Sequence, residues 1–187
     1  MKKLGLLLTV LLLIVGLTTF ASAQSTGDIY LNITIVDAGL NIQSQFPDVT
    51  WGVTNGGYNV STSNQKGTIQ NTGSVTVDLS VRCSATSWGI STDLTPTATE
   101  FVLQGLFCTW NAALTTANFG VEDIIDGTYA AADDNNNFAI VADPDYVKGY
   151  NMPPSQVVNM RFALLPPSSA SSGDTQQITV TVQASAH

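Results

Sequence analysis

Residues 69–83 read IQNTGSVTVDLSVRC and carry the clearest pattern in the 187-residue chain. From Val75 to Cys83 apolar and polar side chains alternate, and in a strand successive side chains point to opposite faces. Residues 71–74 before them are typical of a turn, because Asn tolerates left-handed backbone angles and Gly adopts them freely. The stretch therefore predicts a half-buried antiparallel strand, which needs other strands against its apolar face.

The same alternation recurs on both sides of this stretch, in residues 28–36, 156–165 and 175–185. In the last two segments the side chains expected to face inward are Val158, Met160, Phe162, Leu164, Ile178, Val180, Val182 and Ala184. Shorter extended runs fall at residues 40–42, 49–53 and 138–142. About eight or nine short strands, with no long helical period, favour an all-β fold: an antiparallel two-sheet sandwich, immunoglobulin-like or jelly-roll-like.

Residues 99–110 alternate twice, with opposite phase on the two sides of Gly105. A bulge is one inserted residue that reverses the alternation, and Gly is its usual occupant. A bulge at Gly105 would therefore turn a whole set of side chains inward: Phe101, Leu103, Leu106, Cys108 and Trp110.

Residues 1–23 have the layout of a secretory signal peptide. Lys2 and Lys3 precede the apolar run 4–16, and a small-residue cleavage site ends at Ala23, before Gln24. We expect this leader to be helical, but its apolar run is shorter than the roughly 20 residues that span a bilayer. The predicted product is one exported domain, residues 24–187, that lies outside the cell or on its surface without a membrane span.

The charge of the chain excludes some classes of partner. It holds 14 acidic and six basic residues, a net charge of −8, and all the acidic residues follow the leader. So negative a chain is repelled by nucleic acid and by anionic membrane surfaces. We therefore expect no nucleic-acid partner.

Cys83 and Cys108 are the only cysteines, and an even pair in an exported chain usually forms a disulfide. The loop that this bond would close corresponds to roughly 3 to 4 kcal/mol of stabilisation in the chain-entropy model. The alternative is two buried thiols. We predict the disulfide on the basis of the oxidising compartment.

The sequence offers little for catalysis. The sole histidine, His187, is the last residue, which argues against a Ser-His-Asp hydrolase and most zinc sites. Glu100, Glu122, Asp123 and Asp126 could supply an acid and a nucleophile. However, the Glu122-Asp123 pair lies in an irregular segment without a visible apolar pocket, so solvated loop charges are the preferred interpretation. We expect a protein that is not an enzyme and holds no cofactor.

An acidic loop invites comparison with calcium sites. Its alternate side chains match the first ligands of a calcium loop: Asp133, Asn135 and Asn137. The match then fails, because Phe138 replaces the required Gly and Pro144 the bidentate Glu. A looser oxygen cage that includes Asp143 or Asp145 is an alternative to an exposed polar loop.

Aromatic residues provide a second candidate site. Trp51, Trp88, Trp110 and the five tyrosines could form a platform on which sugars stack. In a small sandwich a Trp more often fills the core, and Trp110 follows Cys108 in a way that suggests packing. Trp51 and Trp88 are therefore the candidate contacts for surface glycans.

The leader, the turn at 71–74 that leads into residues 75–81, and the EFVL run at 100–103 resemble secreted immunoglobulin-like β-sandwich proteins of prokaryotic cell surfaces. The closing segments 160–162, 166–167 and 177–182 extend this resemblance, which in outline includes the TasA and camelysin-type subunits of matrix fibres. The chain lacks the lysine-rich insertions of TasA and an L-P-x-T-G sorting motif. The resemblance implies a structural or adhesive protein of the cell surface or biofilm matrix.

The N-terminal segment suggests how such a subunit would assemble. Residues 28–36 form a strand near a free terminus, without the Lys or Pro that guards edge strands. We hypothesise that residues 28–42 insert into the next subunit, so that copies self-associate into fibres by strand addition. Pairing of this strand within its own sandwich is the alternative. A carbohydrate-binding module that uses exposed Trp and Tyr is the competing function.

Overall fold

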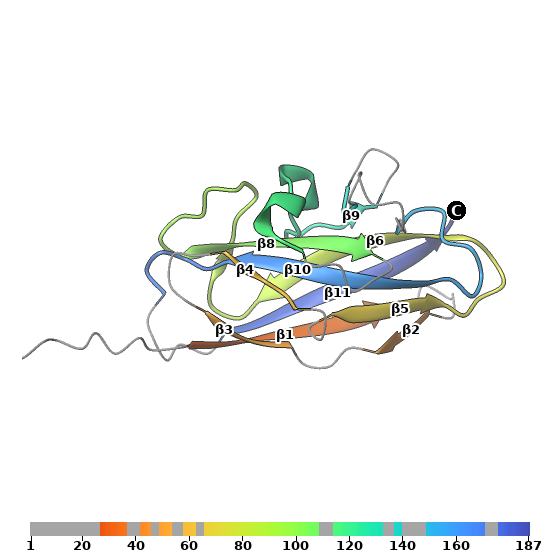
Figure 1. Ribbon diagram of the computed structural model, residues 1–187, viewed down its shortest axis with the longest axis horizontal. Helices are drawn as coiled ribbons and strands as arrows, with labels where there is room; N and C mark the ends of the chain where they lie inside the picture. The colour runs from red at the N-terminus through yellow and green to blue at the C-terminus, as the bar shows by residue number, and fades with distance from the viewer. Residues whose placement is uncertain are drawn as a thin grey trace, which may run out of the picture.

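The computed structural model describes residues 27–36, 42–45, 49–53, 58–62, 66–108, 114–132, 137–139, 149–170 and 176–187. For the strands in 27–36, 42–45 and 49–53 it describes the backbone alone. The described residues form strands β1 to β11 and two short 3-10 helices, arranged as two sheets (Figure 1). The predicted all-β class is confirmed. The leader and the predicted cleavage site at Ala23 and Gln24 lie outside the described residues.

The first sheet contains five strands, in the order β3 (Val49–Val53), β1 (Gly27–Val36), β11 (Gln176–Ala186), β6 (Val77–Ala85) and β9 (Ala130–Ala131). The second follows the order β2 (Ile42–Gln45), β5 (Gly67–Asn71), β10 (Val157–Leu165), β8 (Glu100–Cys108) and β7 (Gly89–Ile90). β4 (Asn59–Val60) also pairs with β10. The helices are η1 (Thr116–Asn118) and η2 (Val121–Asp123).

The alternation that opens the sequence analysis forms β6. Its residues Val77, Leu79, Val81 and Cys83 are buried, and the residues between them are half-buried or exposed. The strand begins two residues later than predicted, because Val75 belongs to the preceding turn and is 45% exposed.

Both sheets bury their facing side chains in one core. On β10 and β11 the inward residues are those predicted, and all are fully buried: Val158, Met160, Phe162, Leu164, Ile178, Val180, Val182 and Ala184. Full burial of one large apolar side chain stabilises a fold by about 1.5–3 kcal/mol. This shared core holds the two sheets together.

The predicted bulge at Gly105 is wrong. β8 and β10 pair without interruption from Cys108 opposite Asn159 to Val102 opposite Leu165. Gly105 stays in the alternation and faces the core. Only a glycine fits at this position, because an added Cβ would lie 2.6 Å from the Met160 methyl and 2.7 Å from Ile125 Cδ1. The glycine therefore makes room for core side chains and marks no inserted residue.

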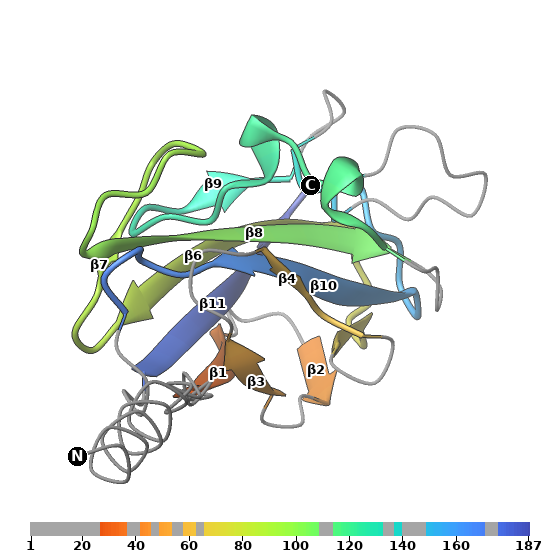
Figure 2. The same cartoon turned by 60° about the vertical axis from the view of Figure 1, so that its left-hand side comes forward.

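Because β8 has no bulge, its even-numbered residues face away from the core between the sheets. A second apolar cluster covers that outer face, formed by Leu106, Ala163 and Phe119, with Leu114 and Val60 packed against it. In both views the short helices lie beside β8 (Figure 2). β8 and β10 are thus buried on both faces.

The expectation of wholly antiparallel sheets is wrong. β1 runs parallel to β11, from Ile29 opposite Gln176 to Val36 opposite Gln183, and β7 runs parallel to β8. The other strand pairs are antiparallel. The expectation fails at β1 because the first and last strands of the chain, far apart in sequence, are neighbours in the sheet (Figure 1).

Candidate functional site

β1 lies between β3 and β11 in its sheet, a position that we call the slot. On one side β1 pairs in parallel with β11 over eight residue positions, and on the other it pairs antiparallel with β3 over five. Of the segment 28–42, residues 28–36 belong to β1, whereas Ile42 begins β2 in the other sheet. Without β1, the backbone groups of β11 and β3 that face this slot would have no ladder partner.

The outer face of the same sheet, away from the core, is rich in hydroxyl and amide groups. Cross-strand pairs on β6 and β11 include Ser84 opposite Thr179 and Ser80 opposite Gln183. Arg82 and Asp78 are the charged residues that β6 adds to this face, opposite Thr181 and Ser185. The Arg82 guanidinium lies 4.6 Å from the centre of the Tyr129 ring, which is 40% exposed.

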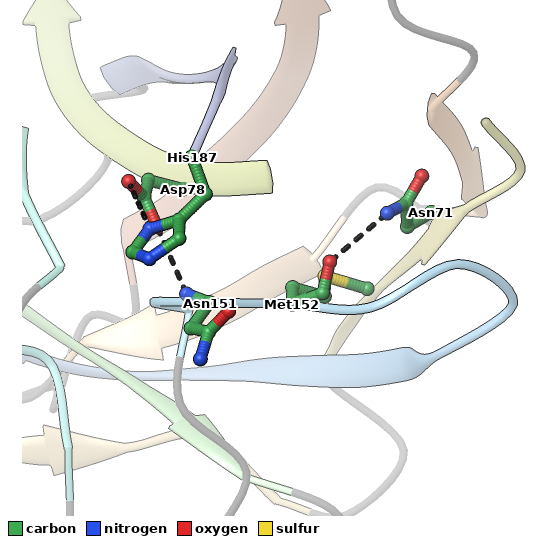
Figure 3. A network of polar contacts seen from close by, with 5 residues as sticks. All are labelled: Asn71, Asp78, Asn151, Met152 and His187. Carbon is green, nitrogen blue, oxygen red and sulfur yellow. Dashed lines mark hydrogen bonds and ion pairs between the residues drawn. The ribbon is translucent and has the colours of Figure 1, made fainter. Parts of the chain in front are cut away.

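A polar clasp fixes the end of β11 to the start of β6 (Figure 3). The Asp78 carboxylate accepts a hydrogen bond from the Asn151 backbone N–H at 2.9 Å and lies 2.9 Å from His187 Nδ1. The His187 backbone N–H donates to the Thr76 carbonyl at 3.0 Å. The His187 ring also meets the Tyr150 ring edge-on, with ring centres 5.0 Å apart. The last residue, expected to be poorly positioned, is therefore held by three groups: the Asp78 carboxylate, the Thr76 carbonyl and the Tyr150 ring.

A buried amide supports the same end of the sheet. Asn71 Nδ2 donates to the Met152 carbonyl at 3.0 Å (Figure 3). It also donates to the Val75 carbonyl at 2.8 Å, while Asn71 Oδ1 accepts from the Gly73 N–H at 3.0 Å. Met152 pairs in turn with Val77, through both backbone groups. Asn71 thus fixes the turn in front of β6, a role beyond the local turn preference noted from sequence.

A hydrolytic triad also contains a His-Asp pair, together with a nucleophile that the His contacts. In the part of the chain that is described, the contacts of the His187 ring are with Asp78 and Tyr150, and neither is a serine, threonine or cysteine nucleophile. Residues 78 and 187 are both partly exposed. We interpret the pair as a structural clasp.

Cys83 and Cys108 are both buried and are not bonded to each other, so the expected disulfide is not formed in the structure. Cys83 faces the core, where its thiol donates to the Ile125 carbonyl at 3.0 Å. Cys108 ends β8 on the outer face, because the bulge that would have turned it inward is absent. Burial, with a smaller effect from Asp126, raises the pKa of Cys83 to about 12.

The expectation that residues 122 and 123 are solvated loop charges is right for Glu122 and wrong for Asp123. Glu122 is exposed, whereas Asp123 is 1% exposed. Burial, with a smaller effect from Glu122, raises the pKa of Asp123 to about 7, although the backbone N–H of Gly120 opposes this rise. A signal was present in the sequence, because an acidic residue three positions after Gly120 can cap that N–H.

Arg161 lies on the outer face of β10, opposite the side chains that face the core, and it is buried there. Its Nε donates to Ser61 Oγ at 3.1 Å, and its guanidinium also bonds to the Ser61 carbonyl. Burial lowers the pKa of Arg161. Alternation had indicated the correct side of the strand but not the layer that covers it.

Of the candidate glycan contacts, Trp88 is partly buried against the core, with its ring centre 6.4 Å from that of Phe101. This placement matches the core-filling role weighed against sugar binding. Trp51 lies in β3, where the structure describes the backbone alone, and Trp110 lies outside the described residues.

The calcium prediction stays a prediction. Asp133, Asn135 and Asp143 lie outside the described residues, and Asn137 is partly buried. Within the described ranges, no group of three His, Cys, Asp or Glu side chains is placed to hold a metal ion.

No helix among the described residues is long and apolar enough to cross a membrane. Three features of the described residues bear on function: the position of β1 between β3 and β11, the polar outer face of that sheet, and the clasp at His187. Compared with known proteins, the chain matches no family model and no curated protein.

Proposed function

We propose that the chain is a secreted structural or adhesive protein of the cell surface or extracellular matrix, without enzymatic activity, whose copies assemble by β-strand addition. The observation that carries this proposal is the position of β1 between β3 and β11. An immunoglobulin-like or jelly-roll-like sandwich type is part of the same proposal, as is export through the leader at residues 1–23.

The geometry of β1 suits exchange between copies. A parallel pair cannot be closed by a tight hairpin, so no short turn ties β1 to β11. The ladder bonds that hold β1 involve backbone groups, and a β1 strand from a second copy offers the same groups. Exchange therefore preserves the pairing while it links two subunits.

The direction of exchange determines the product. If each subunit gives its β1 to the next and receives one from the previous subunit, the contact is head-to-tail and does not close on itself. Contacts of this kind generate open filaments. The sequence of β1, GDIYLNITIV, contains no Lys or Pro that would oppose such pairing.

Removal of the strand tests the proposal. A mature chain that lacks residues 24–36 should form no filaments in electron microscopy and should unfold at a lower temperature. A synthetic peptide of residues 24–36, added to this shortened chain, should raise its unfolding temperature as the peptide concentration increases, because the peptide binds only the folded shortened chain. A peptide with Ile33→Pro is the matched control, since proline removes a ladder donor. Filaments that persist unchanged after the deletion would refute the proposal.

A carbohydrate-binding module is the second candidate. The exposed Tyr129 beside Arg82, next to the hydroxyl and amide groups of β6 and β11, favours this alternative. It predicts a monomer whose binding to neutral glycans is lost in Tyr129→Ala. If the protein assembles and Tyr129→Ala leaves its glycan binding unchanged, Tyr129 does not have that role.

A further inference from the structure

Residues 120–126, which we call the side seam, run along the edge of β8 that faces away from β10. The Ile125 backbone N–H donates to the Leu103 carbonyl at 2.8 Å. Gln104 Nε2 donates to the Gly120 carbonyl at 2.6 Å, and residue 104 also forms an isolated bridge with Ile124. The seam therefore covers part of this edge without forming a full strand.

The same segment reaches the other sheet. The Cys83 backbone N–H, from β6, donates to the Asp126 carbonyl at 2.7 Å, and the Cys83 thiol donates to Ile125. Ile125 is fully buried in the common core. The side seam thus joins β8 to β6 and closes one side of the sandwich.

Asp123 lies within the seam and is almost completely buried. Its Oδ2 accepts a hydrogen bond from the Gly120 N–H at 2.7 Å. Its Oδ1 is the one buried side-chain polar atom without a hydrogen-bond partner in the part of the chain described. A buried carboxylate oxygen that lacks a partner is costly, and it is far less so when the group is a neutral acid.

Among the described residues, the surroundings of Asp123 supply no positive charge. Glu122, on the same turn, adds a negative one, and no basic side chain of the described residues acts on the group. The β8 side contributes the neutral Gln104. The backbone N–H groups of Phe138 and Ala139 lower the pKa of Asp123, but neither of them forms a hydrogen bond to Oδ1. The seam's other charged residue, Asp126, is also acidic. Asp133 and Asp134 follow β9 in the chain and lie outside the described residues.

We propose that the side seam is a proton-controlled closure, which Asp123 keeps shut as a neutral acid and loosens when its carboxyl ionises. As a consequence, Asp123 should make the fold more stable at low pH than at high pH, which is the reverse of the usual effect of a carboxylate. Burial raises the pKa of Asp123 from 3.8 to about 7. The stabilisation is therefore fully present below about pH 4 and is lost as the pH rises through about 7.

Opening of the seam would expose defined groups. Beyond the seam, this edge of β8 is paired with the two residues of β7 and with an isolated bridge between Phe107 and Ala139. Loosening residues 120–126 would therefore uncover backbone groups of β8 and the thiol of Cys83. This closure is independent of how β1 is shared between subunits.

The reactivity of Cys83 measures the opening. The purified chain is treated with a thiol reagent between pH 5 and pH 8, and peptide mass spectrometry separates Cys83 from Cys108. Because thiolate formation itself depends on pH, the rate for Cys83 is divided by its rate in Asp123→Asn at the same pH. Asn resembles the neutral acid in shape. This ratio should rise about a hundredfold from pH 5 to pH 8, because about two pH units lie between pH 5 and the raised pKa of Asp123, and proton linkage supplies a factor of ten for each unit.

A second measurement and a matched variant complete the test. The thermal unfolding midpoint of the wild type should fall relative to that of Asp123→Asn over the same range. Glu122→Gln should retain a smaller rise in the rate ratio that levels off at lower pH, because a charge that raises the pKa of Asp123 is removed. A rate ratio that stays constant with pH would overturn the proposal. So would stabilisation by calcium at pH 8 that Asp123→Asn abolishes, since Oδ1 would then serve a cation.

Discussion

β6 and β8 are both nine-residue strands, and they differ in what covers them. β6 buries one face and leaves the other partly exposed, whereas β8 is buried on both faces beneath the segment around Phe119. On β6 the exposed face is polar, so the phase of the alternation is plain. On β8 both faces are largely apolar, so phase alone cannot say which residues meet the core between the sheets.

This difference explains two errors together. With Leu106 and Cys108 apolar on the outer face of β8, the phase change near Gly105 resembled a bulge. The bulge would have turned Cys108 inward, toward the core that contains Cys83. The misjudged layer therefore accounts for the wrong bulge, and the position of Cys108 on the outer face accounts for the absence of the disulfide that the oxidising compartment had led us to expect.

The largest expected effect tests the covered outer face of β8. Leu106→Ala should destabilise the chain by about 2–5 kcal/mol, as should Leu79→Ala on the inner face of β6, because both side chains are fully buried. Ser80→Ala, on the partly exposed face of β6, should change stability by less than about 0.5 kcal/mol. Urea unfolding of the three variants measures these values. A neutral Leu106→Ala would show that the outer face of β8 is exposed to water.

A smaller effect separates a packing glycine from a bulge glycine. Gly105→Ala should cost about 1–3 kcal/mol, because the new methyl group would overlap Met160 and Ile125. Gly127→Ala is the matched control, since a Cβ there meets nothing within 4 Å. Equal unfolding midpoints for the two variants would contradict the packing role of Gly105.

The clasp on β6 should contribute least. His187→Ala should cost about 0–1 kcal/mol, because both members of the ion pair are partly exposed and water screens their attraction. The residual effect should weaken in high salt. A loss of several kcal/mol in urea unfolding would mean that the Tyr150 contact and the end of β11 matter more than the pair itself.

The sequence predicted the parts of the fold in which local pattern and burial agree. The inward residues of β11 and β10 were assigned to the correct face because Ile178 to Ala184, and Val158 to Phe162, alternate with polar residues. The parallel partnership of β1 with β11 was not predictable, since local alternation does not specify which edge a strand joins. The burial of Asp123 and the contact of His187 with Asp78 likewise depend on segments that only the folded chain brings together.

The most direct measurement of strand sharing is a register-specific disulfide between β1 and β11. Thr34 lies opposite Thr181, so Thr34→Cys with Thr181→Cys, in a Cys83→Ala and Cys108→Ala background, places two thiols at bonding distance. Thr34→Cys with Ser185→Cys is four residues out of register and serves as the control. After oxidation of the assembled protein, strand exchange predicts a ladder of covalent multimers in non-reducing electrophoresis. Internally bonded monomers alone would contradict it.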